Sequence, residues 1–242
     1  MAIGSRVSPP LGGQLHRLPP WLTFGLTGPF NGQRRRAAAV STIFARRPFA
    51  AVIETGTFRA LTTTFLRALT GAPIATIEVN PGYHAYSNRR LRAEQGVECM
   101  LGDSPIVLAR LAGNSVWTSG PTFFYLDAHW LDHLPLLDEL RVIRRGWPDF
   151  AALIDDFRVD GDEGYGYDDY GPGKSIELSL LALPELADLH HFWPAQPASR
   201  ETGTRRGWIV LASPGPMADA LAGLAELRPG GTIGAALAGR GS

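Results

Sequence analysis

The sequence predicts an α/β fold in which helices pack on a mostly parallel β-sheet, and two observations support this prediction. Two short apolar runs, residues 123–126 and 150–154, flank a segment with helical periodicity. Buried apolar strands joined by a helix form a βαβ unit, whose parallel strands end at the same edge of the sheet. A third apolar run, residues 50–53, is followed by a glycine-containing turn and an amphipathic helix, which repeats the pattern.

The composition is that of a soluble globular protein. With 242 residues and a hydrophobic share of 45%, the chain is long enough for one sizeable core and short for two domains. The 23 basic and 23 acidic residues balance, whereas a general nucleic-acid binder is usually basic. The sequence has no apolar run long enough to span a membrane, and its single cysteine, Cys99, offers no disulfide and no thiolate zinc site. We expect a soluble, cytoplasmic protein without nucleic-acid or membrane partners; its oligomeric state is not predicted.

The N-terminal residues 1–30 are rich in glycine and proline, and we expect a loose arm outside a main domain of residues 31–213. From Asn31 onward the pattern predicts a helix that begins with three arginines, residues 34–36. A solvated helix face is the expected place for these arginines. The alternative is that one of them binds an anionic group of a cofactor.

The first predicted strand ends in a turn of sequence Glu-Thr-Gly-Thr-Phe-Arg-Ala, residues 54–60. A strand, a glycine-containing turn and a helix hold nucleotide-like ligands, because the turn brings backbone N–H groups close and the helix N-terminus favours negative charge. The turn has one glycine, Gly56, so it does not match the pyrophosphate-binding pattern GxGxxG. The second strand, residues 74–79, carries Glu78 beside this turn, where an acid suits a ribose diol; the alternative is a surface acid at a strand end.

A helix over residues 83–95 and a third strand, residues 97–101, lead to the sequence Gly102-Asp103-Ser104-Pro105. Ser104 followed by proline indicates a helix N-cap with proline at the first helical position. For Asp103 two roles are open. It can be part of this cap, or it can accept a hydrogen bond from the exocyclic amine of an adenine at this edge of the sheet.

The fourth and fifth predicted strands both end in acidic residues, which should meet at one edge of the sheet. Asp127 follows the fourth strand, and Asp155 and Asp156 follow the fifth. Because neighbouring strands lie about 5 Å apart, the three carboxylates and His129 should converge where open α/β sheets bind ligands.

Three carboxylates at one edge predict a Mg²⁺ site, because Mg²⁺ prefers oxygen ligands and keeps open positions for substrate hydroxyls. Adjacent like charges repel unless a positive group lies between them, which favours a cation beside Asp155 and Asp156. The alternative is that these residues cap turns. His129 could remove the proton of a coordinated hydroxyl, since the pKa of histidine lies near neutrality; the alternative is a structural, hydrogen-bonded histidine.

On the helix between the fourth and fifth strands, Asp138 and Glu139 are expected as solvated charges away from the site. After the fifth strand comes a long loop, residues 158–174, whose tyrosines and glycines favour a mobile lid or a substrate loop over a spacer. A helix over residues 175–183 should follow, ended by Pro184.

The C-terminal part of the chain predicts an antiparallel hairpin of two strands, residues 189–193 and 207–212. The remaining residues, 214–242, predict a helix over residues 217–227 and then a flexible tail, because few large apolar side chains are left to hold it.

The turn at residues 54–60, Glu78 and the sequence Gly102-Asp103-Ser104 resemble the cofactor-binding motifs of class I S-adenosylmethionine-dependent methyltransferases. The resemblance covers residues 31–212, and the antiparallel pair at the end of the sheet also fits it. It implies a three-layer, Rossmann-like methyltransferase fold, whose mostly parallel, seven-stranded sheet has an antiparallel last strand, and it implies S-adenosylmethionine as the cofactor. The residues that it places at the cofactor are Glu54, Gly56, Thr57, Phe58, Arg59, Glu78, Asp103, Ser104 and Asp127.

Within this class the chain is similar to the small metal-dependent O-methyltransferases, including the macrocin and related sugar O-methyltransferases. These enzymes place one Asp after the fourth strand and an acidic pair after the fifth, as Asp127, Asp155 and Asp156 lie here. The resemblance implies Mg²⁺ at these three residues and a general base two or three positions beyond the first Asp, where His129 stands. One departure from the family pattern is Ala60, where relatives often carry glycine.

The sequence therefore predicts a Mg²⁺- and S-adenosylmethionine-dependent O-methyltransferase that acts on a small, hydroxyl-bearing, sugar-like molecule. Two alternatives are open. One is a non-catalytic protein that keeps the cofactor-type fold and recognises a partner or a glycan. The other, less favoured, is a metal-dependent hydrolase at the same edge of the sheet.

Overall fold

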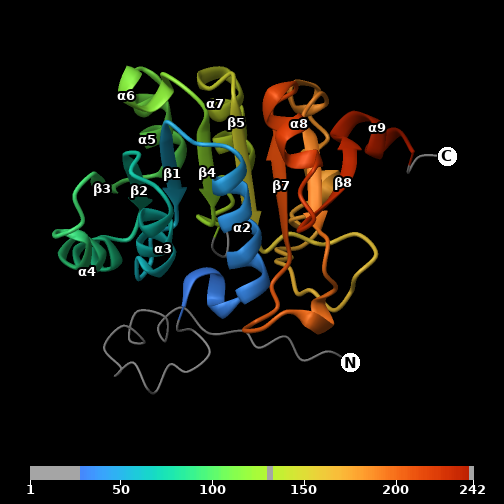
Figure 1. The fold of residues 1–242 in the computed structure, drawn as a ribbon, viewed down its shortest axis with the longest axis horizontal. Helices are drawn as coiled ribbons and strands as arrows, with labels where there is room; N and C mark the ends of the chain where they lie inside the picture. The colour runs from blue at the N-terminus through green and yellow to red at the C-terminus, as the bar shows by residue number, and fades with distance from the viewer. Residues whose placement is uncertain (1–27, 130–132, 240–242) are drawn as a thin grey trace.

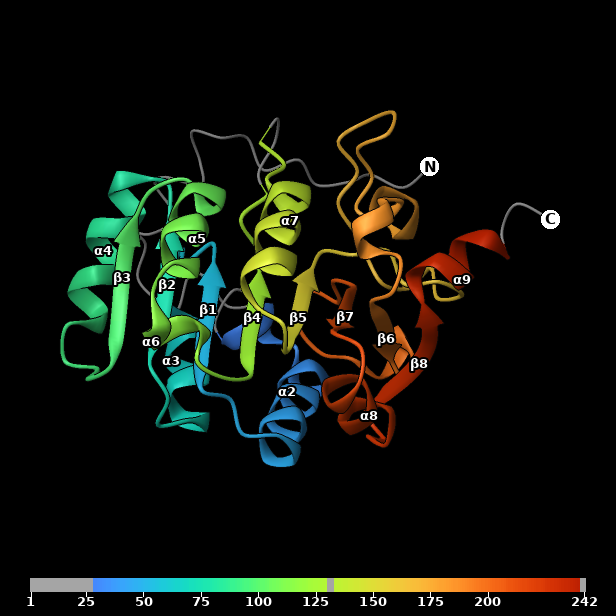
Figure 2. The ribbon, with the colours of Figure 1, turned by 90° about the horizontal axis from the view of Figure 1, so that it is seen from above.

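The computed structural model describes residues 28–129 and 133–239. Within these ranges the protein has three layers, with one sheet between two layers of helices (Figure 1, Figure 2). The strands follow the order β3-β2-β1-β4-β5-β7-β6-β8 across an eight-stranded sheet. The predicted α/β architecture is therefore confirmed, with one strand more than predicted.

The first five strands run parallel, and the last three alternate in direction. β7 pairs antiparallel with β5 and β6, and β8 pairs antiparallel with β6. The predicted antiparallel hairpin is therefore present as β6 and β7. The strands are β1 Ala51–Thr55, β2 Ile74–Glu78, β3 Val97–Leu101, β4 Thr122–Leu126, β5 Phe150–Asp155, β6 His190–Pro194, β7 Trp208–Ala212 and β8 Leu227–Thr232.

The helices that connect the strands cover both faces of the sheet. α5 and α7 pack on one face, and α2, α3 and α8 pack on the other (Figure 2). The α-helices are α2 Arg34–Arg46, α3 Leu61–Leu69, α4 Pro81–Leu91, α5 Ser104–Ala112, α6 Ser115–Thr118, α7 Leu136–Gly146, α8 Pro216–Ala222 and α9 Ile233–Ala238. Short 3₁₀ helices are η2 Pro29–Gly32, η3 Leu178–Leu181, η4 Pro184–Leu186 and η5 Ala198–Arg200.

The two hydrophobic layers follow from the alternation of side chains along each strand. In β4, Phe124 and Leu126 pack with α5 and α7, whereas Phe123 and Tyr125 pack with α2 and α3. Every residue of β1, β2 and β4 is buried, as expected for parallel strands covered on both faces. Because successive residues face opposite layers, the position of a residue along its strand decides which layer its side chain enters.

The start of α2 is held by residues from the C-terminal half of the chain. Its N-cap residue, Gln33, makes no side-chain capping bond. Instead the carboxylate of Glu201 accepts hydrogen bonds from the backbone N–H groups of the second and third helix residues (2.9 and 3.0 Å). The hydroxyl of Thr202 accepts one from the first residue (2.9 Å). The free N–H groups of this helix end are thus satisfied, and the negative charge suits the helix dipole.

Most of the predicted N-terminal arm, up to residue 27, lies outside the described residues. Phe30, which the prediction assigns to the arm, belongs to the body of the protein. It is buried, and its ring centroid lies 5.3 Å from those of Phe65 and Tyr125. The packed part of the chain therefore begins slightly before Asn31.

The segment after β5 differs from the predicted helix over residues 175–183. Ile176 lies in an extended arrangement, in which its carbonyl accepts from the N–H of Arg158 (2.8 Å) and its N–H donates to the carbonyl of Asp168 (2.9 Å). Because the N–H and carbonyl groups of Ile176 bond to the loop, they cannot form helical hydrogen bonds. Only the short helices η3 and η4 follow.

The loop of residues 158–174 is packed against the rest of the protein. Tyr165 is buried, and its hydroxyl donates a hydrogen bond to the carbonyl of Gln196 (3.0 Å). The N–H of Asp168 donates to the carbonyl of Asp156 at the end of β5 (3.0 Å). The loop therefore lies beside the edge of the sheet at which the parallel strands end.

The C-terminal residues also differ from the prediction of a helix over residues 217–227 and a flexible tail. α8 ends at Ala222, before Gly223, and the chain then forms β8 and α9. The apolar spacing that suits a helix is still used for burial, since Leu224 and Leu227 join the same hydrophobic layer as α8. Ile233 of α9 is fully buried, and Ala236 and Leu237 pack against the hydrophobic layer that contains it, so α9 belongs to the packed body.

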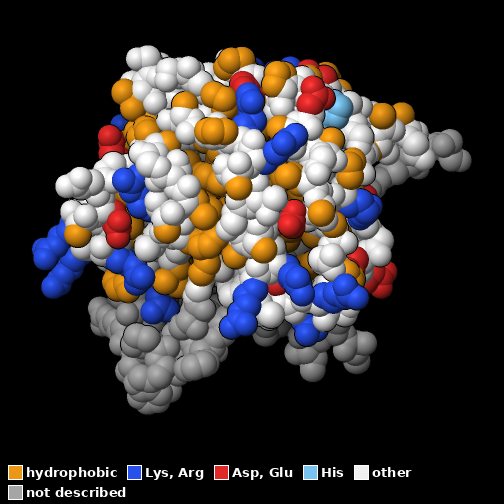
Figure 3. Space-filling model, in the orientation of Figure 1, with side chains coloured by type: hydrophobic (Ala, Val, Ile, Leu, Met, Phe, Trp, Pro, Cys, Tyr) orange, Lys and Arg blue, Asp and Glu red, His pale blue; other side chains and the backbone are white. Residues whose placement is uncertain are grey.

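The surface carries basic side chains along one edge. Lys and Arg gather on the lower edge of the face in Figure 3, which is the edge where the parallel strands end in Figure 1. Arg34 and Arg35, at the start of α2, are exposed, as predicted for a solvated helix face. None of the helices in the described ranges is both long enough and apolar enough for a membrane span.

Candidate active site

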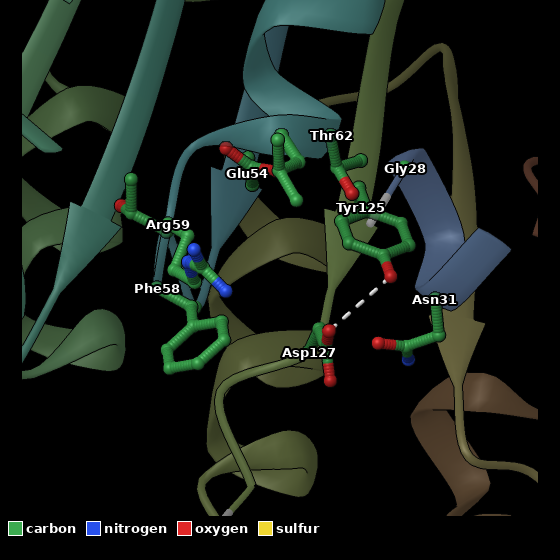
Figure 4. Close-up of a pocket in the computed structure, with 11 residues that line it drawn as sticks. Gly28, Asn31, Glu54, Phe58, Arg59, Thr62, Tyr125 and Asp127 are labelled. Atoms are coloured by element: carbon green, nitrogen blue, oxygen red, sulfur yellow. Dashed lines mark hydrogen bonds between the residues drawn. The ribbon is translucent and has the colours of Figure 1, made fainter. Parts of the chain in front are cut away.

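A pocket opens at the edge where the parallel strands end, beside the turn that follows β1 (Figure 4). In Figure 4 the side chains of Arg59 and Asn31 approach its centre from opposite sides, with Asp127 between them. Six of the nine residues that the resemblance places at the cofactor line this pocket, the exceptions being Glu78, Asp103 and Ser104. The lining residues are Gly28, Asn31, Glu54, Gly56, Thr57, Phe58, Arg59, Leu61, Thr62, Tyr125 and Asp127.

The backbone of the turn explains the position of its glycine. Gly56 has a φ of +84°, and a Cβ atom there would lie 2.1 Å from the backbone oxygen of Asp127. Phe58 and Ala60 also have positive φ values, 46° and 56°, which cost a residue with a side chain about 1–2 kcal/mol each. Ala60, the N-cap residue of α3, therefore occupies a conformation that glycine adopts more easily.

Glu54 supports the turn from the end of β1. Its Oε2 atom accepts hydrogen bonds from the hydroxyls of Thr63 and Thr76, the latter at 2.6 Å. The side chain is buried, and this burial raises the pKa of Glu54 to about 7, against the opposing effect of the two threonines. The carboxyl group therefore changes its protonation state near neutral pH.

Replacing Glu54 with glutamine is expected to remove a pH dependence of stability. The pKa of Glu54 is about 7 in the folded protein and 4.5 ordinarily, so the folded state binds this proton more tightly. The stabilisation is complete below pH 4.5 and is lost as the pH rises through about 7. As the pH rises from 4.5 to about 7, the stability of Glu54→Gln relative to that of the parent should therefore increase by about 2–3 kcal/mol. Urea unfolding at pH 5 and pH 8 measures this, and an equal loss of stability in both proteins would contradict the assignment.

Glu78 lies at the end of β2, directly beside the turn. Its Oε2 accepts a hydrogen bond from the N–H of Phe58 (2.8 Å), and its Oε1 accepts one from the N–H of Asn80 (2.9 Å). Burial raises the pKa of Glu78, and these backbone bonds lower it. Both oxygens are thus fixed by the backbone, which holds the carboxylate in one orientation next to the pocket.

Apolar side chains lie uncovered where β1, β2 and β3 end. Exposed large hydrophobic residues of the described chain include Phe58 (39%), Val79 (55%), Leu101 (47%) and Ile106 (62%). Phe58 and Val79 follow β1 and β2, Leu101 ends β3, and Ile106 lies in the first turn of α5. Exposed apolar side chains that gather at one edge mark a binding surface for an apolar partner or ring.

Asp103 and Ser104 differ from the predicted helix cap. Asp103, rather than Ser104, is the N-cap residue of α5, and its side chain makes no capping bond. One of its carboxylate oxygens instead lies 3.1 Å from Nε2 of His133. Ser104 is buried, and its hydroxyl lies near the carboxyl group of Glu139. Asp103 thus belongs to the cap through its backbone, whose carbonyl accepts from the N–H of Val107 (3.0 Å), and its side chain makes no capping bond.

Asp127, His129 and Asp156 come together at the ends of β4 and β5. Nε2 of His129 lies 4.0 Å from Oδ1 of Asp127 and 3.6 Å from Oδ2 of Asp156. One atom from each of the three residues lies within 4.8 Å of the other two, an arrangement that could hold a metal ion. We call these three residues the rim group.

Asp155 does not join the rim group, which corrects the predicted set of three carboxylates. The residue is fully buried. Its Oδ1 forms an ion pair with Arg36 and accepts a hydrogen bond from the N–H of Asp156 (2.7 Å). Its Oδ2 accepts one from the hydroxyl of Tyr125 (2.5 Å). Since the protein itself uses both oxygens, Asp155 has a structural role in this arrangement.

Arg36 is likewise not on the solvated helix face predicted for residues 34–36. Its side chain is fully buried. Burial lowers the pKa of Arg36, but the neighbouring groups, Asp155 foremost, together raise this pKa by a larger amount. The net shift is upward, so the guanidinium stays ionised. The positive group expected beside Asp155 is therefore a side chain from α2.

The different positions of Asp155 and Asp156 follow from the backbone. Ala151 and Leu153 face the layer that contains α2, and Asp155 continues this alternation toward Arg36. Asp156 then has a φ of 53°, a left-handed conformation that ends the alternation. Its side chain consequently lies beside His129 instead of crossing to the other layer.

The charges of the rim group depend on one another. Burial lowers the pKa of His129, but the Asp156 carboxylate beside it raises the value more, and the net shift is upward. Burial raises the pKa of Asp156, but His129 and Arg206 hold it well below its usual range. The pKa of Asp127 is raised by burial and by the carboxylates of Asp155 and Asp156. Asp156 therefore interacts electrostatically with both Asp127 and His129.

Arg206 and Asp168 belong to the surroundings of the rim group, although the sequence analysis does not identify them. Nε of Arg206 donates a hydrogen bond to Oδ1 of Asp156, and Nη2 of the same guanidinium donates one to Oδ1 of Asp168. Asp168 also accepts a hydrogen bond from the hydroxyl of Tyr170 (2.5 Å). The signal that could have indicated Arg206 is strand register, because Trp208 pairs with Asp155 in the antiparallel ladder.

Glu139 also differs from its predicted place as a solvated charge. Asp138 is exposed, but Glu139 is buried at 1% exposure, near the hydroxyls of Ser104 and Thr55. Burial raises its pKa, and the two hydroxyls lower it. The periodicity of α7 explains the difference, because Glu139 shares the buried face with Leu136, Leu140 and Ile143.

No protein-family model and no curated protein sequence matches the chain. Solved structures match over most of its length. The O-methyltransferase TomG from Streptomyces achromogenes, involved in tomaymycin synthesis and solved with S-adenosylmethionine, is 16% identical with a TM-score of 0.56, over 85% of this chain and 89% of that one. A protein from Klebsiella pneumoniae named as an O-methyltransferase is 15% identical with a TM-score of 0.51, over 84% and 86%.

These similarities show the fold. The chain has the Rossmann-like fold of the S-adenosylmethionine-dependent methyltransferases, as the motifs at residues 54–60, Glu78 and Asp103 predict. Fold alone does not determine activity, so the activity depends on the chemistry of the pocket and the rim group.

Proposed function

We propose that the protein is an S-adenosylmethionine-dependent methyltransferase, which transfers a methyl group to a hydroxyl of a small, polyhydroxylated acceptor such as a sugar. The observation that carries this proposal is the position of Asp127. Its side chain lines the pocket beside the β1 turn and also belongs to the rim group. A ligand in the pocket and a second ligand at the rim would therefore meet at Asp127, as a methyl donor and its acceptor must.

The pocket and its surroundings fit the parts of S-adenosylmethionine. The fixed carboxylate of Glu78 suits the two hydroxyls of a ribose beside the turn. The exposed side chains of Val79, Leu101 and Ile106 offer apolar contacts for an adenine ring. Asp103, which makes no capping bond, can accept a hydrogen bond from the exocyclic amine of that ring.

The rim group fits a hydroxyl acceptor and a divalent cation, which the sequence predicts to be Mg²⁺. When bound, such a cation lowers the pKa of a coordinated hydroxyl and holds it in place. Asp127, Asp156 and His129 are the residues that would hold the cation. His129 can be one of its ligands, or it can be the predicted proton acceptor, but one lone pair on Nε2 cannot serve both roles at once.

Calorimetric titration of the purified protein with S-adenosylmethionine tests the proposal. We expect a single site per chain and competition by S-adenosylhomocysteine. A protein that binds neither compound would contradict the proposed function. Binding without methyl transfer to a panel of sugars and polyols would instead support the alternative of a non-catalytic binding protein.

Replacing Glu78 with glutamine is expected to weaken the binding of S-adenosylmethionine by about 10–100-fold, because hydrogen bonds to a charged group contribute about 1.5–3 kcal/mol. The exposed Glu98 on the neighbouring strand β3 offers a matched control, and Glu98→Gln should bind like the parent. Urea unfolding of both variants reports whether the backbone bonds of residue 78 survive the change. Equal affinity in all three proteins would show that Glu78 does not hold the ribose.

A further inference from the structure

The rim group presents three ligand atoms that lie within 4.8 Å of one another. The distances from Nε2 of His129 to the nearest oxygens of Asp127 and Asp156, 4.0 and 3.6 Å, are too long for hydrogen bonds. His129 is only 6% exposed, and Nε2 has no hydrogen-bond partner in the described part of the chain. A buried polar atom without a partner costs about 1–3 kcal/mol. The arrangement is therefore incomplete without a further ligand.

The other oxygen of each carboxylate lies beside a neighbouring side chain. Oδ2 of Asp127 lies 3.2 Å from the hydroxyl oxygen of Tyr125, whose single proton is directed to Asp155 at 2.5 Å. Oδ1 of Asp156 accepts a hydrogen bond from Nε of Arg206. Such outer hydrogen bonds orient the ligands of metal sites. They leave one free oxygen on each carboxylate, and these two oxygens are the atoms that face His129.

The spacing of the three atoms suits a small dication after a modest closure. Ligand atoms bound at about 2.0–2.1 Å to one ion lie about 3.0–3.4 Å apart in octahedral or tetrahedral sites. The two distances from Nε2, 3.6 and 4.0 Å, exceed this by about an ångström at most, and the two carboxylate oxygens lie within 4.8 Å of each other. Rotation of the side chains covers such a difference, so the backbone can stay in place.

We propose that Asp127, His129 and Asp156 bind a first-row transition-metal dication through one nitrogen and two oxygens, in preference to Mg²⁺. Mg²⁺ prefers oxygen ligands, whereas imidazole nitrogen favours the transition metals, whose affinity rises from Mn²⁺ toward Cu²⁺. The all-oxygen set predicted from the sequence cannot form in this structure, because both oxygens of Asp155 are bound to other groups. His129 takes the place of that third carboxylate.

This inference deepens the proposed function, on which the role of the cation in methyl transfer rests. Binding of the cation itself can be measured independently of that function. As a metal ligand, Nε2 of His129 has no lone pair left for a proton, so the histidine is then not the base. The remaining coordination positions are open to hydroxyl oxygens of the acceptor.

Titration of the metal-free, full-length protein with Co²⁺ tests the proposal, because the visible absorption of Co²⁺ reports its ligands without any need for activity. We expect one Co²⁺ per chain and at least about a tenfold weaker competition by Mg²⁺ than by Zn²⁺. Binding of S-adenosylmethionine is measured on the same samples by calorimetry. Cofactor binding without Co²⁺ binding would overturn the inference and leave the cofactor proposal standing.

Two variants identify the nitrogen ligand. His129→Asp restores an all-oxygen set, so it should lower the preference for Co²⁺ over Mg²⁺ by about tenfold or more and change the visible spectrum. Nε2 of His84, on α4, lies 3.1 Å from the carbonyl oxygen of Cys99, and the residue is outside the rim group. His84→Ala is therefore the matched control, and it should leave the metal preference and the visible spectrum unchanged. An unchanged preference and spectrum in a folded His129→Asp variant would overturn the assignment of His129 as a ligand.

Discussion

Replacing Arg36 with methionine is expected to destabilise the protein by about 3–5 kcal/mol, because the change leaves the carboxylate of Asp155 buried without its counter-ion. Both side chains of this pair are fully buried. The variant also loses the hydrogen bonds from the guanidinium to the side chain of Gln33 (3.1 Å) and to the carbonyl of Arg206 (2.5 Å). Urea unfolding followed by circular dichroism measures the loss.

Arg35→Met is the matched control, because Arg35 is the exposed neighbour on the same helix. Its effect should stay within about 0.5 kcal/mol, as for most surface substitutions. Adding Asp155→Asn to the Arg36→Met variant removes the buried charge and should recover part of the lost stability. If Arg36→Met proved as stable as Arg35→Met, the buried ion pair would not have the role that we assign to it.

Replacing Gly56 with alanine is expected to cost about 3 kcal/mol or more, from the strain of a positive φ and from a steric clash. The added Cβ would lie 2.1 Å from the backbone oxygen of Asp127, so the turn must move away from β4. The same movement would displace Asp127 from the edge shared by the pocket and the rim group. We therefore expect loss of S-adenosylmethionine binding together with the lower stability.

Gly71→Ala is the control for this change. A Cβ atom at Gly71 meets no atom within 4 Å, and the residue does not have a positive φ. Its stability should therefore differ little from that of the parent, and its cofactor affinity should be unchanged. Calorimetry and urea unfolding of both variants give the comparison. Equal behaviour of the two alanine variants would show that the turn tolerates a side chain at residue 56.

The sequence predicts most of the parallel sheet and the acidic ends of its strands. Runs of four to six mostly apolar residues are enough to place β1 to β5 within two residues at each end, and β1, β2, β4 and β5 are buried, as is typical of parallel strands covered on both faces. The convergence of Asp127, Asp156 and His129 follows from the same reasoning, since strands that run parallel end at one edge.

The directions of individual side chains could not be predicted in this way. Asp155 and Asp156 look alike in sequence, and a single left-handed residue separates their roles. Arg36 directly follows two exposed arginines and lies 119 positions away from Asp155, so local patterns cannot indicate their pairing. The same limit applies to β8, whose sequence from Leu227 to Thr232 contains two glycines and a proline and gains its strand conformation by pairing with β6.

The hydrogen bonds that Glu201 and Thr202 make to the start of α2 affect the order in which parts of the protein fold. They join residues 165–168 positions apart, and contacts between such distant residues form late in folding because a long loop must close first. During synthesis, the strands β1 to β5 leave the ribosome before Glu201 and Arg206 have been made. The site at the sheet edge is therefore completed only when nearly the whole chain has been synthesised.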